Sequence, residues 1–158
     1  MRKVLCPHMT ALSDSEILFS VSNNSIIIKP FSKERLTPAG YDFSSGTSFD
    51  LDPKKQKLVA TAEHLELSSD LLGALHLKSS LCREAVIGSF AVIDPGFRGN
   101  LTLSLYNSGE KTIQIEKNEP LIQVVFHRLG EPSINPYHGK YQDSSGLVES
   151  KRKNENRC

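Results

Sequence analysis

The sequence predicts a mainly β domain, a distorted jelly roll or β-sandwich with one or two short helices. Three observations lead to this expectation. Apolar and polar residues alternate from Leu101 to Tyr106, a period of two that places successive side chains on opposite faces of a strand. Short apolar or β-branched runs recur between turn residues, as in all-β folds. The 158 residues, 38% of them hydrophobic, suit one compact domain.

Local signals in the first half of the chain predict two strands and three short helical segments. Residues 13–16 (Ser-Asp-Ser-Glu) have the spacing of a capping box, so a short helix should open the domain. Residues 25–28 (Ser-Ile-Ile-Ile) and 57–62 (Lys-Leu-Val-Ala-Thr-Ala) predict strands. Residues 68–70 (Ser-Ser-Asp) predict a cap for one helical turn, and residues 79–83 predict another turn of helix.

The second half predicts a series of strands. The leucines of residues 101–106 share one face, so Ser104 should face the other way. Residues 111–115 and 121–126 continue the series, with a break at residues 118–120 (Asn-Glu-Pro).

The domain organisation follows from where these signals end. We expect a single domain over residues 1–149, whose last part, from about residue 131, is a closing segment. Residues 150–158 are rich in charge and predict a mobile tail.

Composition restricts the possible partners. The chain has 19 Lys and Arg against 18 Asp and Glu, a balance that favours neither nucleic-acid nor membrane binding and points to a small-molecule partner. It has no apolar run of about 20 residues and no secretion signal, so we expect a soluble, cytoplasmic protein. Cys6, Cys82 and Cys158 are widely spaced, which predicts free thiols rather than disulfides or a zinc site.

Asp94 is the strongest catalytic candidate. It lies in a predicted tight turn between two apolar strands, followed by Pro95, which fixes one turn dihedral, and Gly96, which permits a positive φ. A carboxylate held at a fixed angle in this way suits a general base. The structural alternative is that Asp94 only starts the turn, as an Asp before Pro-Gly usually does.

The pattern Ile-Asp-x-x-aromatic-Arg-Gly of residues 93–99 resembles the third motif of the trimeric dUTPase and dCTP deaminase superfamily. The resemblance implies that Asp94 orients the water that attacks the α-phosphorus of a nucleotide. It places Phe97 beneath the deoxyribose, where the family commonly has Tyr. It further implies that the hairpin reads uracil through its main chain, at Thr102, Leu103 and Ser104.

Residues 78–83 combine hydroxyl groups with two cations, a mixture suited to phosphate binding. They resemble the second motif of the family, usually Gly-Arg-Ser-Ser-Leu-Ala, with a Lys that keeps the charge but loses the bidentate fork of Arg. The resemblance implies that the phosphates contact Lys78, Ser79, Ser80, Leu81, Cys82 and Arg83. Small hydroxyl residues beside a Lys also describe many capped helices.

Two further motifs match in family order. Residues 38–43 (Pro-Ala-Gly-Tyr-Asp-Phe) resemble the first motif, which implies that Asp42 reaches Mg²⁺ through water. The alternative is that Asp42 is a structural loop acid. Gln123, an amide in an apolar strand, matches the fourth-motif Gln that faces the phosphates; the alternative is an edge-strand glutamine bonded to backbone.

The C-terminal part resembles the closing segment of the deaminase branch and of archaeal-type dUTPases. This resemblance implies that Tyr137 and Lys140 close over the base and phosphates. Those relatives often carry Gln four residues after the Lys, whereas this chain has Ser144.

Two positions distinguish the reactions of the superfamily. Deaminases use a Glu as acid and base where this chain has Ser104, and tend to have an Arg where it has Val92. A hydroxyl cannot accept and return protons as a tuned carboxylate can. The sequence therefore resembles a dUTPase on the deaminase branch, using Mg²⁺ to convert dUTP to dUMP and pyrophosphate, and the family implies a homotrimer with sites at subunit boundaries. A dCTP deaminase with another acid and base, or a nucleotide-binding regulatory protein, are the alternatives.

Overall fold

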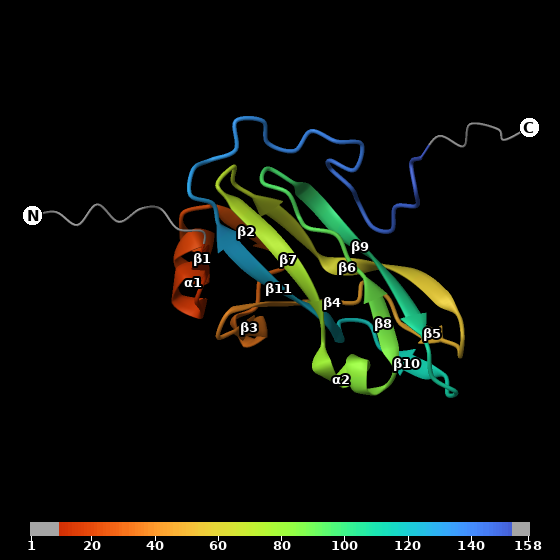
Figure 1. Ribbon diagram of the computed structural model, residues 1–158. Helices are drawn as coiled ribbons and strands as arrows, with labels where there is room; N and C mark the ends of the chain where they lie inside the picture. The colour runs from red at the N-terminus through yellow and green to blue at the C-terminus, as the bar shows by residue number, and fades with distance from the viewer. Residues whose placement is uncertain (1–9, 153–158) are drawn as a thin grey trace, which may run out of the picture.

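A computed structural model describes residues 10–152 and shows a β-sandwich built from antiparallel strands (Figure 1). The larger sheet is organised around β11 (Pro120–Arg128), which pairs with three other strands. Its remaining members are β1 (Thr10–Ala11), β3 (Leu36–Thr37), β4 (Gly40–Ser44) and β7 (Leu71–Leu77).

Two further sheets complete the sandwich. The four-stranded sheet has the order β2-β6-β9-β8. Its strands are β2 (Ile26–Lys29), β6 (Gln56–Leu67), β8 (Val86–Ser89) and β9 (Arg98–Asn107). A small sheet pairs β5 (Phe49–Leu51) with β10 (Ile113–Ile115). The predicted mainly β sandwich is confirmed.

The helices are short and few. The α-helices α1 (Asp14–Ser22) and α2 (Ser79–Arg83) form where the sequence predicts them, and one 3-10 turn, η1, spans Lys33–Arg35. The capping box is present, since the main-chain N–H of Ser13 donates to a carboxylate oxygen of Glu16 at 2.8 Å. Within residues 10–152, no helix combines the length and apolar character that a membrane crossing requires.

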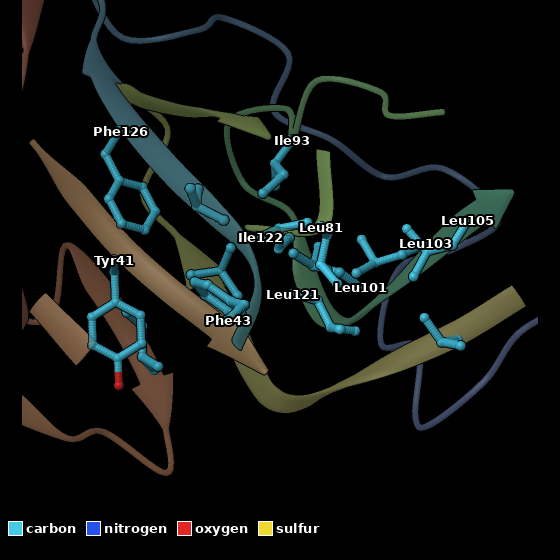
Figure 2. Close-up of a cluster of buried hydrophobic side chains, with 14 of the residues drawn as sticks. Tyr41, Phe43, Leu81, Ile93, Leu101, Leu103, Leu105, Leu121, Ile122 and Phe126 are labelled. Carbon is cyan, nitrogen blue, oxygen red and sulfur yellow. The ribbon is translucent and has the colours of Figure 1, made fainter. Parts of the chain in front are cut away.

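The core lies between the facing sheets, and β9 supplies one wall of it. Leu101, Leu103 and Leu105 are at most 7% exposed, and Figure 2 shows them in a row along the strand. Thr102 and Tyr106, on the opposite face, are exposed. The predicted period of two is therefore confirmed, and Ser104 does point away from the leucines.

One local prediction is wrong and two need new boundaries. Residues 68–70 do not cap a helical turn: the hydroxyl of Ser68 donates to Asp70 at 2.5 Å in a tight turn that leads into β7. Pairing with β11 and burial of Leu71 favour the strand over a single turn of helix. The strand expected at residues 57–62 extends to Leu67 through a register shift, and β10 begins at Ile113 rather than at residue 111.

Candidate functional site

The tight turn that carries Asp94 forms as predicted, but the apolar strand expected before it does not: residues 90–92 lie outside any strand, and Ile93 forms only an isolated β-bridge. The main-chain N–H of Phe97 donates to the carbonyl of Asp94 at 3.1 Å, and Gly96 has a φ of 82°, a value that suits glycine at the third position of a type II turn. Just before the turn, Ile93 and Gly73 exchange two hydrogen bonds of 2.8 and 3.0 Å. These contacts fasten one side of the turn to β7 and leave the Asp94 side chain exposed.

A cavity of about 470 Å³ lies beside this turn. Its walls are mainly apolar, which is usual for a small-molecule site with a few polar groups. The structure brings five of the sequence-predicted residues to its lining: Asp94, Phe97, Thr102, Leu103 and Tyr137. Ser104 lies one residue beyond the last of these on β9, and its hydroxyl accepts a hydrogen bond from the Gln56 amide at 2.8 Å.

The C-terminal strap, residues 136–148, lies against the same turn. Figure 1 shows this blue segment crossing the end of the molecule at which β9 begins. Tyr137 donates its main-chain N–H to Pro95 at 2.8 Å, and its ring centroid is 5.8 Å from that of Phe97. Ser144, at the position where relatives often have Gln, is buried and forms a parallel β-bridge with Gly99.

Tyr141, which sequence reasoning did not select, also lines the cavity. The main-chain N–H of Lys151 donates a hydrogen bond of 3.0 Å to the hydroxyl oxygen of Tyr141, and this bond is the main cause that lowers the pKa of the Tyr141 phenol. The cations of Lys140 and Lys151 lower the same pKa further. Their ammonium groups lie 5.5 and 5.6 Å from the centroid of the ring. Lys140 thus sits close to the cavity without lining it.

A second group of predicted residues gathers on the larger sheet. The register of β4 and β11 places Asp42 opposite Gln123, and that of β7 and β11 places His76 on the other side of Gln123. The Lys78 ammonium group lies 2.6 Å from one carboxylate oxygen of Asp42. His76 had no sequence signal, because strand register decides its place in this row.

The alternative reading of Gln123 as an edge-strand residue bonded to backbone is wrong. β11 lies inside the sheet, between β4 and β7. The side-chain amide donates to the hydroxyl of Thr37 instead.

The residues of α2 divide by exposure. Ser79, Ser80, Cys82 and Arg83 are exposed, whereas Leu81 is 3% exposed and belongs to the core. A contact between Leu81 and a substrate would therefore use its main chain. Cys82 is a free thiol, as predicted. Cys6 and Cys158 lie outside the described residues, as do positions 153–158 of the predicted tail.

The two groups do not meet within one chain. Ile93 lies opposite Gly73, and Lys78 follows Gly73 by five residues along β7 and the start of α2. At about 3.3 Å per residue, the five residues from Gly73 to Lys78 span about 16 Å. Asp94, one residue beyond Ile93 in the antiparallel direction, is farther still from Lys78. The predicted residues therefore form two separate groups within one chain, which we call half-sites.

Asp42 has the chemistry expected of a magnesium contact through water. One of its carboxylate oxygens is buried and has no hydrogen-bond partner among residues 10–152. That part of the chain contains no cluster of three or more acidic, His or Cys residues suited to a metal. Mg²⁺ in nucleotide sites typically uses one or two protein carboxylates and completes its shell with phosphates and water, so this arrangement fits.

Sequence comparisons link the chain to nucleotide enzymes. A family profile described as dCTP deaminase-like matches residues 44–129. The chain is 44% identical over 143 residues to a Pyrococcus horikoshii protein named dCTP deaminase, a match that covers 81% of this chain and 92% of the relative. It is 26% identical over 155 residues to a probable deoxyuridine 5'-triphosphate nucleotidohydrolase of Sulfolobus islandicus rod-shaped virus 1, covering 89% of this chain and 98% of that protein.

Solved structures of phage dUTPases have the same fold. The dUTPase of Staphylococcus bacteriophage 80alpha, in a complex with dUpNHpp, superposes with a TM-score of 0.57 at 20% identity, covering 73% of this chain and 98% of the other. A dUTPase from phage phi11 of S. aureus, whose structure describes a structural Mg(II) ion, gives a TM-score of 0.58 at 19% identity with the same coverage. The dUTPase-like fold expected from the motifs is thereby confirmed.

Proposed function

We propose, because the chain belongs to the family of dUTPases and dCTP deaminases, that it hydrolyses dUTP to dUMP and pyrophosphate. The profile match over residues 44–129 and the relative that is 44% identical establish this membership. The chain is an enzyme of this family. The proposal concerns which of the two family reactions it performs.

The proposal rests on the residues at positions 94 and 104, in the turn and strand beside the cavity. Asp94 lines the cavity from an ordered turn, whereas position 104 holds a serine whose hydroxyl is engaged by Gln56. Deamination requires a group that protonates and deprotonates the base and its leaving amine, and a serine hydroxyl is a poor choice for that role. Hydrolysis at the α-phosphorus requires a positioned water, which a single carboxylate at the cavity can orient.

In the proposed mechanism, Asp94 orients the water and accepts its proton as the water oxygen bonds to the α-phosphorus. The bond from that phosphorus to the bridging oxygen breaks, and pyrophosphate leaves with the electron pair. Phe97 and Tyr137 supply the apolar wall against which the sugar and base pack. The main chain around Thr102 and Leu103 offers donors and acceptors that suit a uracil edge.

The second half-site supplies the phosphate contacts in this proposal. Its cations and hydroxyl groups, which are exposed except for the partly buried Lys78, would stabilise the negative charge that grows on the leaving pyrophosphate together with the amide of Gln123. These groups are Lys78, Ser79, Ser80 and Arg83. Mg²⁺, held by Asp42 through water, would neutralise further charge on the same phosphates.

A complete site then needs two copies of the chain. The separation of Lys78 and Asp94 along β7 supports an arrangement in which one nucleotide contacts Asp94 of one chain and Lys78 of another. A symmetric oligomer can place the Asp94 half-site of one subunit beside the Lys78 half-site of the next. We therefore propose a homotrimer with its sites at the subunit boundaries.

dCTP deamination is the second candidate, because relatives that are 41 to 44% identical to this chain are named dCTP deaminase. The carboxylates that line the cavity are Asp94 and Glu149. In a deaminase that lacks an acid at position 104, Glu149 is the available group for the acid and base role.

Product analysis separates these candidates. The purified protein is incubated with Mg²⁺ and, in separate reactions, with dUTP, dCTP or dTTP, and both pyrophosphate and ammonia are measured. We expect pyrophosphate from dUTP, no ammonia, and loss of turnover in Asp94→Asn with nucleotide binding largely kept. Ammonia from dCTP that disappears in Glu149→Gln would instead establish the deaminase. Binding of nucleotide without either product would point to a regulatory protein.

A further inference from the structure

Every carbonyl group of residues 94–98 has a hydrogen-bond donor. Each of these five carbonyls therefore has a fixed partner, which leaves the turn few alternative conformations. The donors, in chain order of the carbonyls, are the main-chain N–H of Phe97 (3.1 Å), the main-chain N–H of Tyr137 (2.8 Å), the side-chain amide of Gln142 (2.9 Å), the main-chain N–H of Leu67 (3.0 Å) and the main-chain N–H of Asp143 (2.8 Å).

Gln142 stands out in this set because it binds through its side chain and at both ends of its amide. Its Nε2 donates to the carbonyl of Gly96, and its Oε1 accepts the main-chain N–H of Arg98 at 3.0 Å. One side chain therefore spans Phe97 and holds the main chain on either side of it. The side-chain amide of Gln142 thus uses its N–H donor and its carbonyl acceptor at the same time.

The neighbours of Gln142 hold its amide in place before substrate arrives. Its own main-chain N–H donates to Gly139 at 3.0 Å. The next residue, Asp143, forms an ion pair with Arg98 through two hydrogen bonds. Gly99 has a φ of 149°, and a Cβ at that position would lie 2.8 Å from the main-chain nitrogen of Ser144, so the strap approaches the backbone of β9 closely.

The direction of the Asp94 carboxylate depends on this turn. Asp94 is exposed, so side-chain packing does little to hold it, and the turn dihedrals set where it points. The bridge between Ile93 and Gly73 fixes the main chain before Asp94. The strap fixes the main chain after it.

We infer that Gln142 is a positioning residue for Asp94, acting through the main chain of Gly96 and Arg98. This inference rests on the proposed function of Asp94, and assigns to a residue of the C-terminal segment, to which the resemblance gives no role, the task of keeping the carboxylate aligned with the attacking water. Loss of the amide lets the turn sample other dihedrals, which lowers the fraction of aligned carboxylates. Such misalignment slows the chemical step more than it weakens nucleotide binding.

The test compares Gln142→Met, which keeps side-chain length but removes both hydrogen bonds, with Gln114→Met on β10, an exposed glutamine in the small sheet. For Gln142→Met we expect kcat for pyrophosphate release from dUTP to fall by between about tenfold and about 100-fold. KM and the binding of a non-hydrolysable dUTP analogue should change by less than about threefold. Gln114→Met should match the wild type in every constant.

Two further measurements separate a positioning role from a general loss of structure. Combined with Asp94→Asn, the change Gln142→Met should lower the residual kcat by less than about twofold, because the group it aligns is already absent. Hydrogen exchange of the peptide containing residues 94–98 should accelerate in Gln142→Met, while peptides of β9 and β11 keep wild-type rates.

The outcomes are distinguishable from those of the function test. A wild-type protein that releases no pyrophosphate from dUTP overturns the proposed function, and the exchange of residues 94–98 still tests the role of Gln142. Unchanged exchange in Gln142→Met overturns the inference whatever the reaction. A wild-type kcat in Gln142→Met, or a loss that is fully additive with Asp94→Asn, overturns it as well.

Discussion

The ion pair between Lys78 and Asp42 allows a quantitative test of how the second half-site is held. The two groups are 2.6 Å apart, and their side chains are 30% and 12% exposed, respectively. The other oxygen of Asp42 is already buried without a partner among residues 10–152. Lys78→Met keeps the apolar stem of the side chain and removes the charge, so it leaves a largely buried carboxylate with no cation beside it.

The expected loss lies between two limits. Breaking a fully buried pair costs about 3 to 5 kcal/mol, and losing an exposed pair costs about 0.2 to 1 kcal/mol. Because Asp42 is nearly buried and Lys78 is partly exposed, we expect the free energy of unfolding to fall by about 2 kcal/mol. For a chain of this length, this corresponds to a decrease in melting temperature of about 4 to 8 °C.

Denaturant unfolding followed by circular dichroism, at one fixed protein concentration, measures this loss. Lys117→Met, at an exposed lysine, is the control and should stay within about 0.5 kcal/mol of the wild type. Asp42→Asn in the Lys78→Met background should recover part of the loss, because a neutral amide is cheaper to bury than an unpaired charge. The reasoning is refuted if Lys78→Met is as stable as Lys117→Met, or if Asp42→Asn lowers its stability further.

Further predictions concern the assembly, the strap and the core. Asp94→Asn and Lys78→Met proteins, each with little activity alone, should regain about a quarter of wild-type activity when unfolded together and refolded at equal amounts, because random mixing gives about one site in four an intact Asp94 and an intact Lys78; no recovery would argue against sites shared between subunits. The hydrogen bond from Arg98 holds the pKa of Asp143 below its ordinary value of 3.8, so the pair supports the strap at neutral pH and this support is lost as the pH falls through the lowered pKa. Protection of the amides in residues 136–148, measured as exchange relative to the intrinsic rate at the same pH, should therefore fall on acidification, and Asp143→Asn should remove that step. Leu103→Ala, at a position 1% exposed, should lower the free energy of unfolding by about 3 kcal/mol in denaturant titrations; a loss below about 1 kcal/mol would contradict its place in the core.

Much of the fold could be predicted because its signals are local. The capping box at Ser13 needs only Glu16, three residues away, and the burial of alternate leucines on β9 follows from their period of two. Residues 68–70 predict a helix cap but form a turn, because Ser and Asp favour both structures. Pairing of Leu71 and Leu72 with Arg128 and His127 on β11, far along the chain, decides between them.

The site was predictable in part for the same reason. Motif residues such as Asp94 and Phe97 could be selected from the sequence, and both line the cavity. That the predicted residues form two half-sites could not be seen, because the pairing of Ile93 with Gly73 sets their separation. The contacts of His76 depend on strand register and those of Gln142 depend on the path of the strap, and the local sequence specifies neither.

The position of β11 within the larger sheet has a consequence for biosynthesis. This strand begins at residue 120 of 158, yet it joins β4 and β7, which the ribosome makes much earlier. Until β11 emerges, the nascent chain carries two strand edges that await their shared neighbour, and such edges are prone to pair with other chains. Slow translation before residue 120 would prolong this exposure and so favour association between nascent chains over native pairing.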